Sequence, residues 1–123
     1  ISQLFFDNDA FYRFRDKLQQ KNIVVPVDAG IMPIINKNQI ERTVSMCGAS
    51  IPHKFSVIFN RYQDAPEALK DAGIAYATEQ IIDLIANGVR GIHLYTMNNI
   101  EVATQIYQNI KNILQTSNEE PIQ

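Results

Sequence analysis

The sequence predicts an α/β fold in which parallel strands alternate with helices, as three of the eight units of a (β/α)8 TIM barrel. Three short apolar segments carry this prediction, because each ends in polar residues that open a helical pattern: residues 1–7, 22–34 and 88–98. Strands that each lead into a helix pair in parallel with their neighbours. Polar side chains that follow such strands meet at one edge of the sheet, where α/β proteins build their sites.

Composition limits the possible classes of protein. A chain of 123 residues, with 46% apolar and 20% charged residues, is typical of one globular domain with its own core. A net charge of −2 with both signs interspersed gives no basic face for nucleic acid. The one cysteine, Cys47, excludes an internal disulfide and a multi-cysteine metal site, and it is expected as a small buried side chain. We expect no membrane span and no signal peptide, and therefore a cytoplasmic location.

The three strands are expected at 1–6, 23–25 and 91–96. The run Leu4-Phe5-Phe6 is apolar on successive residues, which is typical of a strand covered on both faces. Pro26 has no backbone donor, so the second strand must bend, bulge or stop pairing there. Gly30 then lets the backbone turn freely.

Five helices are expected between and after these strands. Gly73 lies inside the fourth helix, where glycine costs roughly 1 kcal/mol relative to alanine, so it predicts close packing against another backbone. Glu101 is placed to reach back toward the start of the fifth helix. The five helices are one between a cap at 7–9 and Asn22, one from 36–38 to Gly48, a short one capped by Ser50 with Pro52 in its first turn, one capped by Asp64 and ended by Gly88, and one that begins at 98–99.

Apolar residues at i, i+3, i+4 and i+7 predict which face of each helix is buried. The domain is expected to span 1–114, and the polar tail 115–123 is expected to fray. The predicted buried positions are Phe11, Phe14 and Leu18; Ile40, Val44 and Cys47; Phe55, Ile58, Phe59 and Tyr62; Leu69, Gly73, Tyr76, Ala77, Ile81, Leu84 and Ile85; and Val102, Ile106, Ile110, Ile113 and Leu114.

Three such strands do not make a closed fold. With helices on one side, the other sheet face would expose apolar side chains, which soluble proteins avoid. Further strands of the same protein or a second copy could close it. A whole barrel takes ~250 residues, so the chain is expected to be the last three of eight units plus an inserted helix. A small doubly wound sheet is the competing architecture, but the five glycines form neither GxGxxG nor GxxxxGK[ST].

Four segments in register resemble the methylenetetrahydrofolate reductase family: ISQLFFD at 1–7, GIMPI at 30–34, Gly48-x-x-Ile51-Pro52, and HLYTMN at 93–98. The resemblance covers residues 1–114 and places them at the last three β/α units. It implies a barrel that binds FAD at the carboxyl ends of its strands and uses NADH or NADPH to reduce 5,10-methylenetetrahydrofolate to 5-methyltetrahydrofolate. The family's proton-donating glutamate and most flavin contacts belong to earlier strands. The resemblance therefore implies no catalytic residue in this chain and an isolated chain without activity.

What the resemblance leaves to this chain is one wall of the folate and nicotinamide site. Gln3 matches a strand glutamine whose amide can both donate to and accept from a pterin or a nicotinamide. Gln39 matches a glutamine near the aminobenzoyl group of folate. Thr43 stands where some members carry a stacking aromatic residue, and Asn99 stands where members often carry an arginine for the folate tail. Tyr95, at the end of the third strand, is a candidate flavin or folate contact.

Other interpretations of these residues remain open. Without the resemblance, Gln3 is expected to be structural and Gln39 a solvated helix residue. His93 is expected to be hydrogen-bonded in the core, since no second metal ligand accompanies it, and His53 to be exposed. Three functions compete: the C-terminal portion of a folate-reducing flavoenzyme, a fragment that folds only by self-association, and a binding module without flavin. The partner is then either the preceding half of a barrel or a second copy of the chain.

Overall fold

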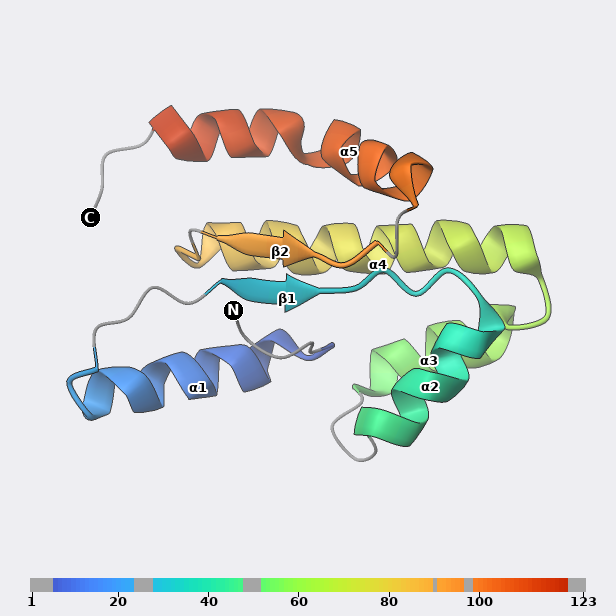
Figure 1. Ribbon diagram of the computed structural model, residues 1–123, viewed down its shortest axis with the longest axis horizontal. Coiled ribbons are helices and arrows are strands. Elements are labelled where there is room, and N and C mark those ends of the chain that lie inside the picture. The colour runs from blue at the N-terminus through green and yellow to red at the C-terminus, as the bar shows by residue number, and fades with distance from the viewer. Residues whose placement is uncertain (1–5, 24–27, 48–51, 90, 97–98, 120–123) are drawn as a thin grey trace.

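The computed structural model describes residues 6–23, 28–47, 52–89, 91–96 and 99–119. In Figure 1, α4 runs behind both strands, α5 and α1 lie on either side, and α2 and α3 lie together beyond the carboxyl ends of the strands. The elements in chain order are α1 (Asn8–Gln20), β1 (Ala29–Ile31), α2 (Lys37–Cys47), α3 (His53–Tyr62), α4 (Pro66–Ala86), β2 (Ile92–Leu94) and α5 (Ile100–Glu119).

The two described strands pair in parallel. Ala29 lies opposite Ile92, and Ile31 lies opposite Leu94. The ladder extends at both ends, because the Ala29 amide donates to the Gly91 carbonyl and the Tyr95 amide donates to the Ile31 carbonyl, each at 2.8 Å. The predicted parallel arrangement of strand and helix units is confirmed for this pair. Of the predicted first strand, residues 1–5 lie outside the described residues.

The predicted second strand at 23–25 falls mostly outside the described residues. Ile23 lies outside any strand, residues 24–27 are outside the described part, and the strand that pairs with β2 follows Pro26. Ala29 and Ile31 are fully buried in the core beside α4. Burial of these two side chains and the ladder to β2 therefore define the strand. Gly30 between them is part of the ladder and not a turn.

Helix α4 lies at the centre of the packing, in contact with α1, α3, α5 and β1. One core cluster joins α4 to α5, α1 and the strands, and includes Ile31, Leu84 and Ile106. A second cluster is aromatic: the ring centroids of Phe55 and Phe59 lie 4.3 Å apart, and those of Phe55 and Tyr76 lie 5.6 Å apart.

Most of the predicted buried positions are confirmed. On α4 all of them are buried except Ile85, which is half-buried. Phe14 and Tyr62, with 46% and 40% of their surface exposed, are the clear errors. The side chains of Val44 and Cys47 lie outside the described part of the structure, so their burial stays a prediction.

The predicted close approach at Gly73 is confirmed. A Cβ atom on this residue would lie 2.7 Å from the carbonyl carbon of Ile34 and closer still to its oxygen. Real Cβ atoms essentially never come within 3.0 Å of such an atom. Glycine is therefore required where α4 crosses the loop that follows β1.

Three of the predicted helix boundaries are confirmed. The Asp7 carboxylate accepts from the Asp9 amide at 3.0 Å and caps α1, which gives way to a left-handed Asn22 with a φ of 57°. Gly88 follows α4 with a φ of 84°, a conformation that favours glycine.

The predicted caps at Asp64 and Glu101 are wrong. Ala65 occupies the cap position of α4, and the Asp64 carboxylate faces the Lys37 ammonium at 3.5 Å. The Glu101 carboxylate binds the Lys70 ammonium at 2.8 Å, which links α5 to α4. In both cases a cation on another element holds the carboxylate.

Two further boundaries differ from the prediction. Pro52 is the cap residue of α3 and precedes its first turn. Helix α5 continues to Glu119, into the tail that was expected to fray. The predicted caps at Gly48 and Ser50 lie outside the described residues.

Candidate functional site

The face of the sheet opposite α4 carries His93 and Tyr95. Successive side chains of a strand point to opposite faces of the sheet. Ile92 and Leu94 pack against the core cluster, so His93 and Tyr95 point to the other face. The rings of His93 and Tyr95 lie 4.3 Å apart with planes inclined at 53°. The expectation of a core histidine is wrong, because His93 is exposed on this face. His53 is exposed, as expected.

Four of the five predicted site residues follow the described strands. Tyr95 and Asn99 follow β2, whereas Gln39 and Thr43 lie on α2, which follows β1. Because β1 and β2 are parallel, all four lie beyond the same edge of the sheet. Figure 1 shows α2 and the start of α5 at this end. Gln3 lies outside the described residues.

Gln39 is half-buried in the first turn of α2, and its side chain is oriented by the backbone. Its Oε1 accepts a hydrogen bond from the Ile35 amide at 2.8 Å. The backbone N–H of Gln39 donates to the Asn36 side-chain oxygen at 2.9 Å, which caps the helix. Because the Ile35 amide occupies one lone pair of Oε1, this orientation favours donation to a ligand from the side-chain nitrogen.

Thr43 and Asn99 also have structural surroundings. Thr43 has only 1% of its surface exposed, and its hydroxyl is buried with no hydrogen-bond partner in the part of the chain that the structure describes. The Asn99 side-chain oxygen accepts from the Val102 amide at 3.1 Å and so caps α5. The predicted ligand contacts of both residues stay predictions.

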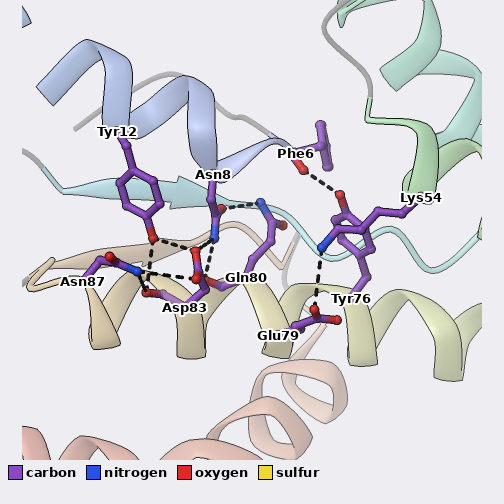
Figure 2. Close-up of polar contacts among 9 residues, drawn as sticks. All are labelled: Phe6, Asn8, Tyr12, Lys54, Tyr76, Glu79, Gln80, Asp83 and Asn87. Carbon is purple, nitrogen blue, oxygen red and sulfur yellow. Dashed lines mark hydrogen bonds and ion pairs between the residues drawn. The ribbon is translucent and has the colours of Figure 1, made fainter. Parts of the chain in front are cut away.

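A separate cleft of about 490 Å³ lies between the starts of α1 and α3 and the side of α4. Figure 2 shows its polar network. The Asn8 amide nitrogen donates to the Asp83 carboxylate at 2.8 Å, and the Gln80 amide nitrogen donates to the Asn8 side-chain oxygen at 3.2 Å. The Tyr12 hydroxyl donates to the same Asp83 carboxylate at 2.6 Å.

The electrostatics of this network follow from its geometry. Hydrogen bonds from Tyr12 and Asn8 lower the pKa of Asp83. Burial, and then the hydrogen bond to Asp83, raise the pKa of Tyr12 to about 12. Across the cleft, the Tyr76 hydroxyl donates to the Phe6 carbonyl at 2.6 Å, and burial raises the pKa of Tyr76. The polar groups named here bind one another and so join α1 to α4.

This network was not predicted from the sequence. A signal for it was available, since Gln80 falls on the otherwise apolar inward face of α4 and is itself buried. Among the described residues, no group of three or more His, Cys, Asp or Glu side chains could hold a metal ion. Within the same residues, every helix is too short or too polar to cross a membrane.

Comparison with known proteins identifies relatives over nearly the whole chain. Residues 1–111 match the sequence profile of the family described as methylenetetrahydrofolate reductase. Methylenetetrahydrofolate reductase (NADH) 1 of Arabidopsis thaliana is 36% identical over 110 residues, which are 89% of this chain and 19% of that protein. The maize protein of the same name is 34% identical over 110 residues, which are 89% of this chain and 18% of that protein.

Bacterial relatives are similar to the same region. The 5,10-methylenetetrahydrofolate reductase of Escherichia coli is 32% identical over 106 residues, which are 86% of this chain and 36% of that protein. The chain therefore spans about a fifth of the length of the plant relatives and about a third of the length of this bacterial one.

Proposed function

Because this chain belongs to the methylenetetrahydrofolate reductase family, we propose that it is the C-terminal part of a (β/α)8 barrel that reduces 5,10-methylenetetrahydrofolate. The single observation that carries this proposal is the common edge beyond which Gln39, Tyr95 and Asn99 lie, because ligands of α/β proteins bind at the carboxyl ends of parallel strands. The activity itself is inferred from relatives that are much longer than this chain.

In this proposal the chain contributes binding and not chemistry. FAD, when bound, would supply the hydride-transfer chemistry of the reaction. The Tyr95 ring lies on the sheet face to which the neighbouring strand contributes Gly30. Because Gly30 has no side chain, this face would leave room for a flat aromatic ligand against the Tyr95 ring. The Gln39 amide nitrogen would bind an acceptor oxygen of the folate, and Gln3, Thr43 and Asn99 would complete the wall. NADH is the reductant to test first, because the plant relatives carry NADH in their names.

The isolated chain is proposed to be inactive. The described sheet has two strands, fewer than a closed barrel requires. The unpaired edges of such a sheet favour docking, either to the preceding half of a barrel or to a second copy of the chain.

The proposal is tested on the full-length protein that contains this chain. Purified under anaerobic conditions, it is expected to carry flavin absorbance and to oxidise NADH in a saturable reaction that depends on 5,10-methylenetetrahydrofolate. A parallel assay with NADPH identifies the preferred reductant. Folate binding without any reduction would favour a binding module, and a folded protein without folate-dependent oxidation of either nucleotide would overturn the proposal.

A matched pair of tyrosine variants localises the site. Tyr95→Ala is expected to lower kcat/KM about tenfold or more, because an aromatic contact with a flat ligand is lost. Tyr107→Ala on α5 is the control, since Tyr107 has 55% of its surface exposed and lies on a helix outside the sheet. Equal rates for both variants would remove Tyr95 from the site.

A further inference from the structure

Helix α4 fixes the loop between β1 and α2 by direct backbone contact. Gly73 is buried, and the space that its Cβ atom would need is filled by the carbonyl group of Ile34. Ile34 has 2% of its surface exposed and packs in the aromatic core cluster, so the loop cannot move outward to make room. The position of Ile34 therefore depends on the absence of a side chain at residue 73.

The residue after Ile34 orients Gln39. The amide of Ile35 belongs to the same stretch of loop, and it donates to Gln39 Oε1 at 2.8 Å. If the carboxamide turned over, its nitrogen would face the Ile35 amide, and two donors would oppose each other. The loop thus selects one orientation, in which one lone pair of the Gln39 oxygen is bound to the backbone and its nitrogen is available as a donor to a ligand.

We propose that Gly73 is a positioning residue for the substrate site, which it serves by holding Gln39 as a hydrogen-bond donor to an acceptor oxygen of the ligand. This inference rests on the proposed function, since it assigns Gln39 to folate binding. It adds a direction: the group that Gln39 meets is a carbonyl or carboxylate oxygen, and not an N–H donor. It also adds Gly73, a residue of α4, which like α2 lies between β1 and β2 along the chain.

The donor role predicts a specific difference between two variants of Gln39. Gln39→Glu keeps an oxygen for the Ile35 amide, so the loop stays in place, but it replaces the donor with a negatively charged acceptor. Gln39→Met removes both groups. We expect Gln39→Glu to raise KM for 5,10-methylenetetrahydrofolate about tenfold or more, and further than Gln39→Met does, with kcat little changed in either variant.

A double-mutant cycle tests whether Gly73 acts through Gln39. In the full-length protein, Gly73→Ala is expected to raise KM for the folate with little change in kcat. Combined with Gln39→Met, it is expected to add almost nothing, because residues that act through one contact are not additive. Hydrogen exchange gives a readout without ligand: the Ile35 amide is expected to be protected in the wild type and in Gln39→Glu, and to lose protection in Gln39→Met and Gly73→Ala.

Gly88→Ala is the matched control. Gly88 adopts a φ of 84°, so alanine there is strained, but its Cβ would meet nothing within 4 Å and it lies at the far end of α4. It is expected to lower the melting temperature without changing KM. If Gly73→Ala does not fold, Ile35→Pro removes the same link from the loop side and is expected to raise KM in the same way.

The outcomes separate the two proposals. A wild-type protein without folate-dependent NADH or NADPH oxidation would overturn the proposed function. If the wild type is active, any of three results would overturn this inference alone. These are an unchanged KM in folded Gly73→Ala or Ile35→Pro, effects on KM that multiply in the double variant, or a smaller rise in KM for Gln39→Glu than for Gln39→Met.

Discussion

The hydroxyl of Tyr12 on α1 donates a 2.6 Å hydrogen bond to the carboxylate of Asp83 on α4. Asn8, one turn earlier on α1, donates to the same carboxylate. The guanidinium of Arg15 lies 5.1 Å from the centre of the Tyr12 ring and donates to the Asn87 carbonyl just after α4. These contacts join α1 to α4, and Figure 2 shows those of Asn8 and Tyr12.

Removal of the Tyr12 hydroxyl is expected to weaken this connection. Tyr12→Phe should lower the free energy of unfolding by about 0.5–1 kcal/mol, which is the value for a hydrogen bond to a charged group discounted for solvent screening. Denaturant unfolding of the full-length protein measures the difference. Tyr107→Phe, on an exposed residue of α5, should change nothing, and equal stability of the two variants would show that the Tyr12 hydroxyl contributes none.

The same pair makes stability depend on pH at both extremes. The pKa of Asp83 lies below its ordinary value of 3.8, so its contribution is present above pH 3.8 and is lost as the pH falls through the lower folded value. The pKa of Tyr12 rises from 10.0 to about 12, so its contribution is present below pH 10 and is lost as the pH rises toward 12. Melting temperatures of wild type and Asp83→Asn should therefore differ most near neutral pH and converge in acid. A difference that is constant with pH would contradict this account.

The aromatic core cluster predicts a large difference between two neighbours on α3. Phe55 has 1% of its surface exposed and contacts the rings of Phe6, Phe59 and Tyr76. Phe55→Ala should cost about 3–5 kcal/mol through lost burial and the cavity left behind. Val57, with 53% of its surface exposed, is the control, and Val57→Ala should cost less than about 0.5 kcal/mol. Similar losses would show that the cluster is not a core.

The isolated chain is expected to associate with itself. Its sheet has two described strands. Among the described residues, the helices of the core cluster pack on the sheet face of Leu94 and not on the face that carries His93. Sedimentation velocity over a concentration series should give an average mass that rises with concentration. A monomer at every concentration would contradict this expectation.

The sequence predicted what depends on local pattern and missed what depends on partners from elsewhere. Gly73 was predicted correctly, because a glycine inside a helix has few reasons other than close packing. The exposure of Phe14 was missed, since a helical period identifies a stripe but not its width. Asp64 and Glu101 fit the cap rules, yet Lys37 and Lys70 bind them, and no local pattern reveals such cations.

The second strand shows the same limit. Ile23, Val24 and Val25 have the residue types of a strand, but the strand that pairs with β2 is formed around Gly30. Its position depends on burial of Ala29 and Ile31 near α4, which is a tertiary contact. For the site, the sequence predicted the common edge of Gln39, Tyr95 and Asn99, whereas the orientation of Gln39 by Ile35 required the folded loop.

The most direct test of this account is a crystal structure of the full-length protein with a bound folate. The ligand is expected to lie at the carboxyl ends of β1 and β2, within about 4 Å of Tyr95 and of the Gln39 side-chain nitrogen. A folate bound instead in the cleft between α1, α3 and α4, or a helix packed over the sheet face of His93 and Tyr95, would contradict it.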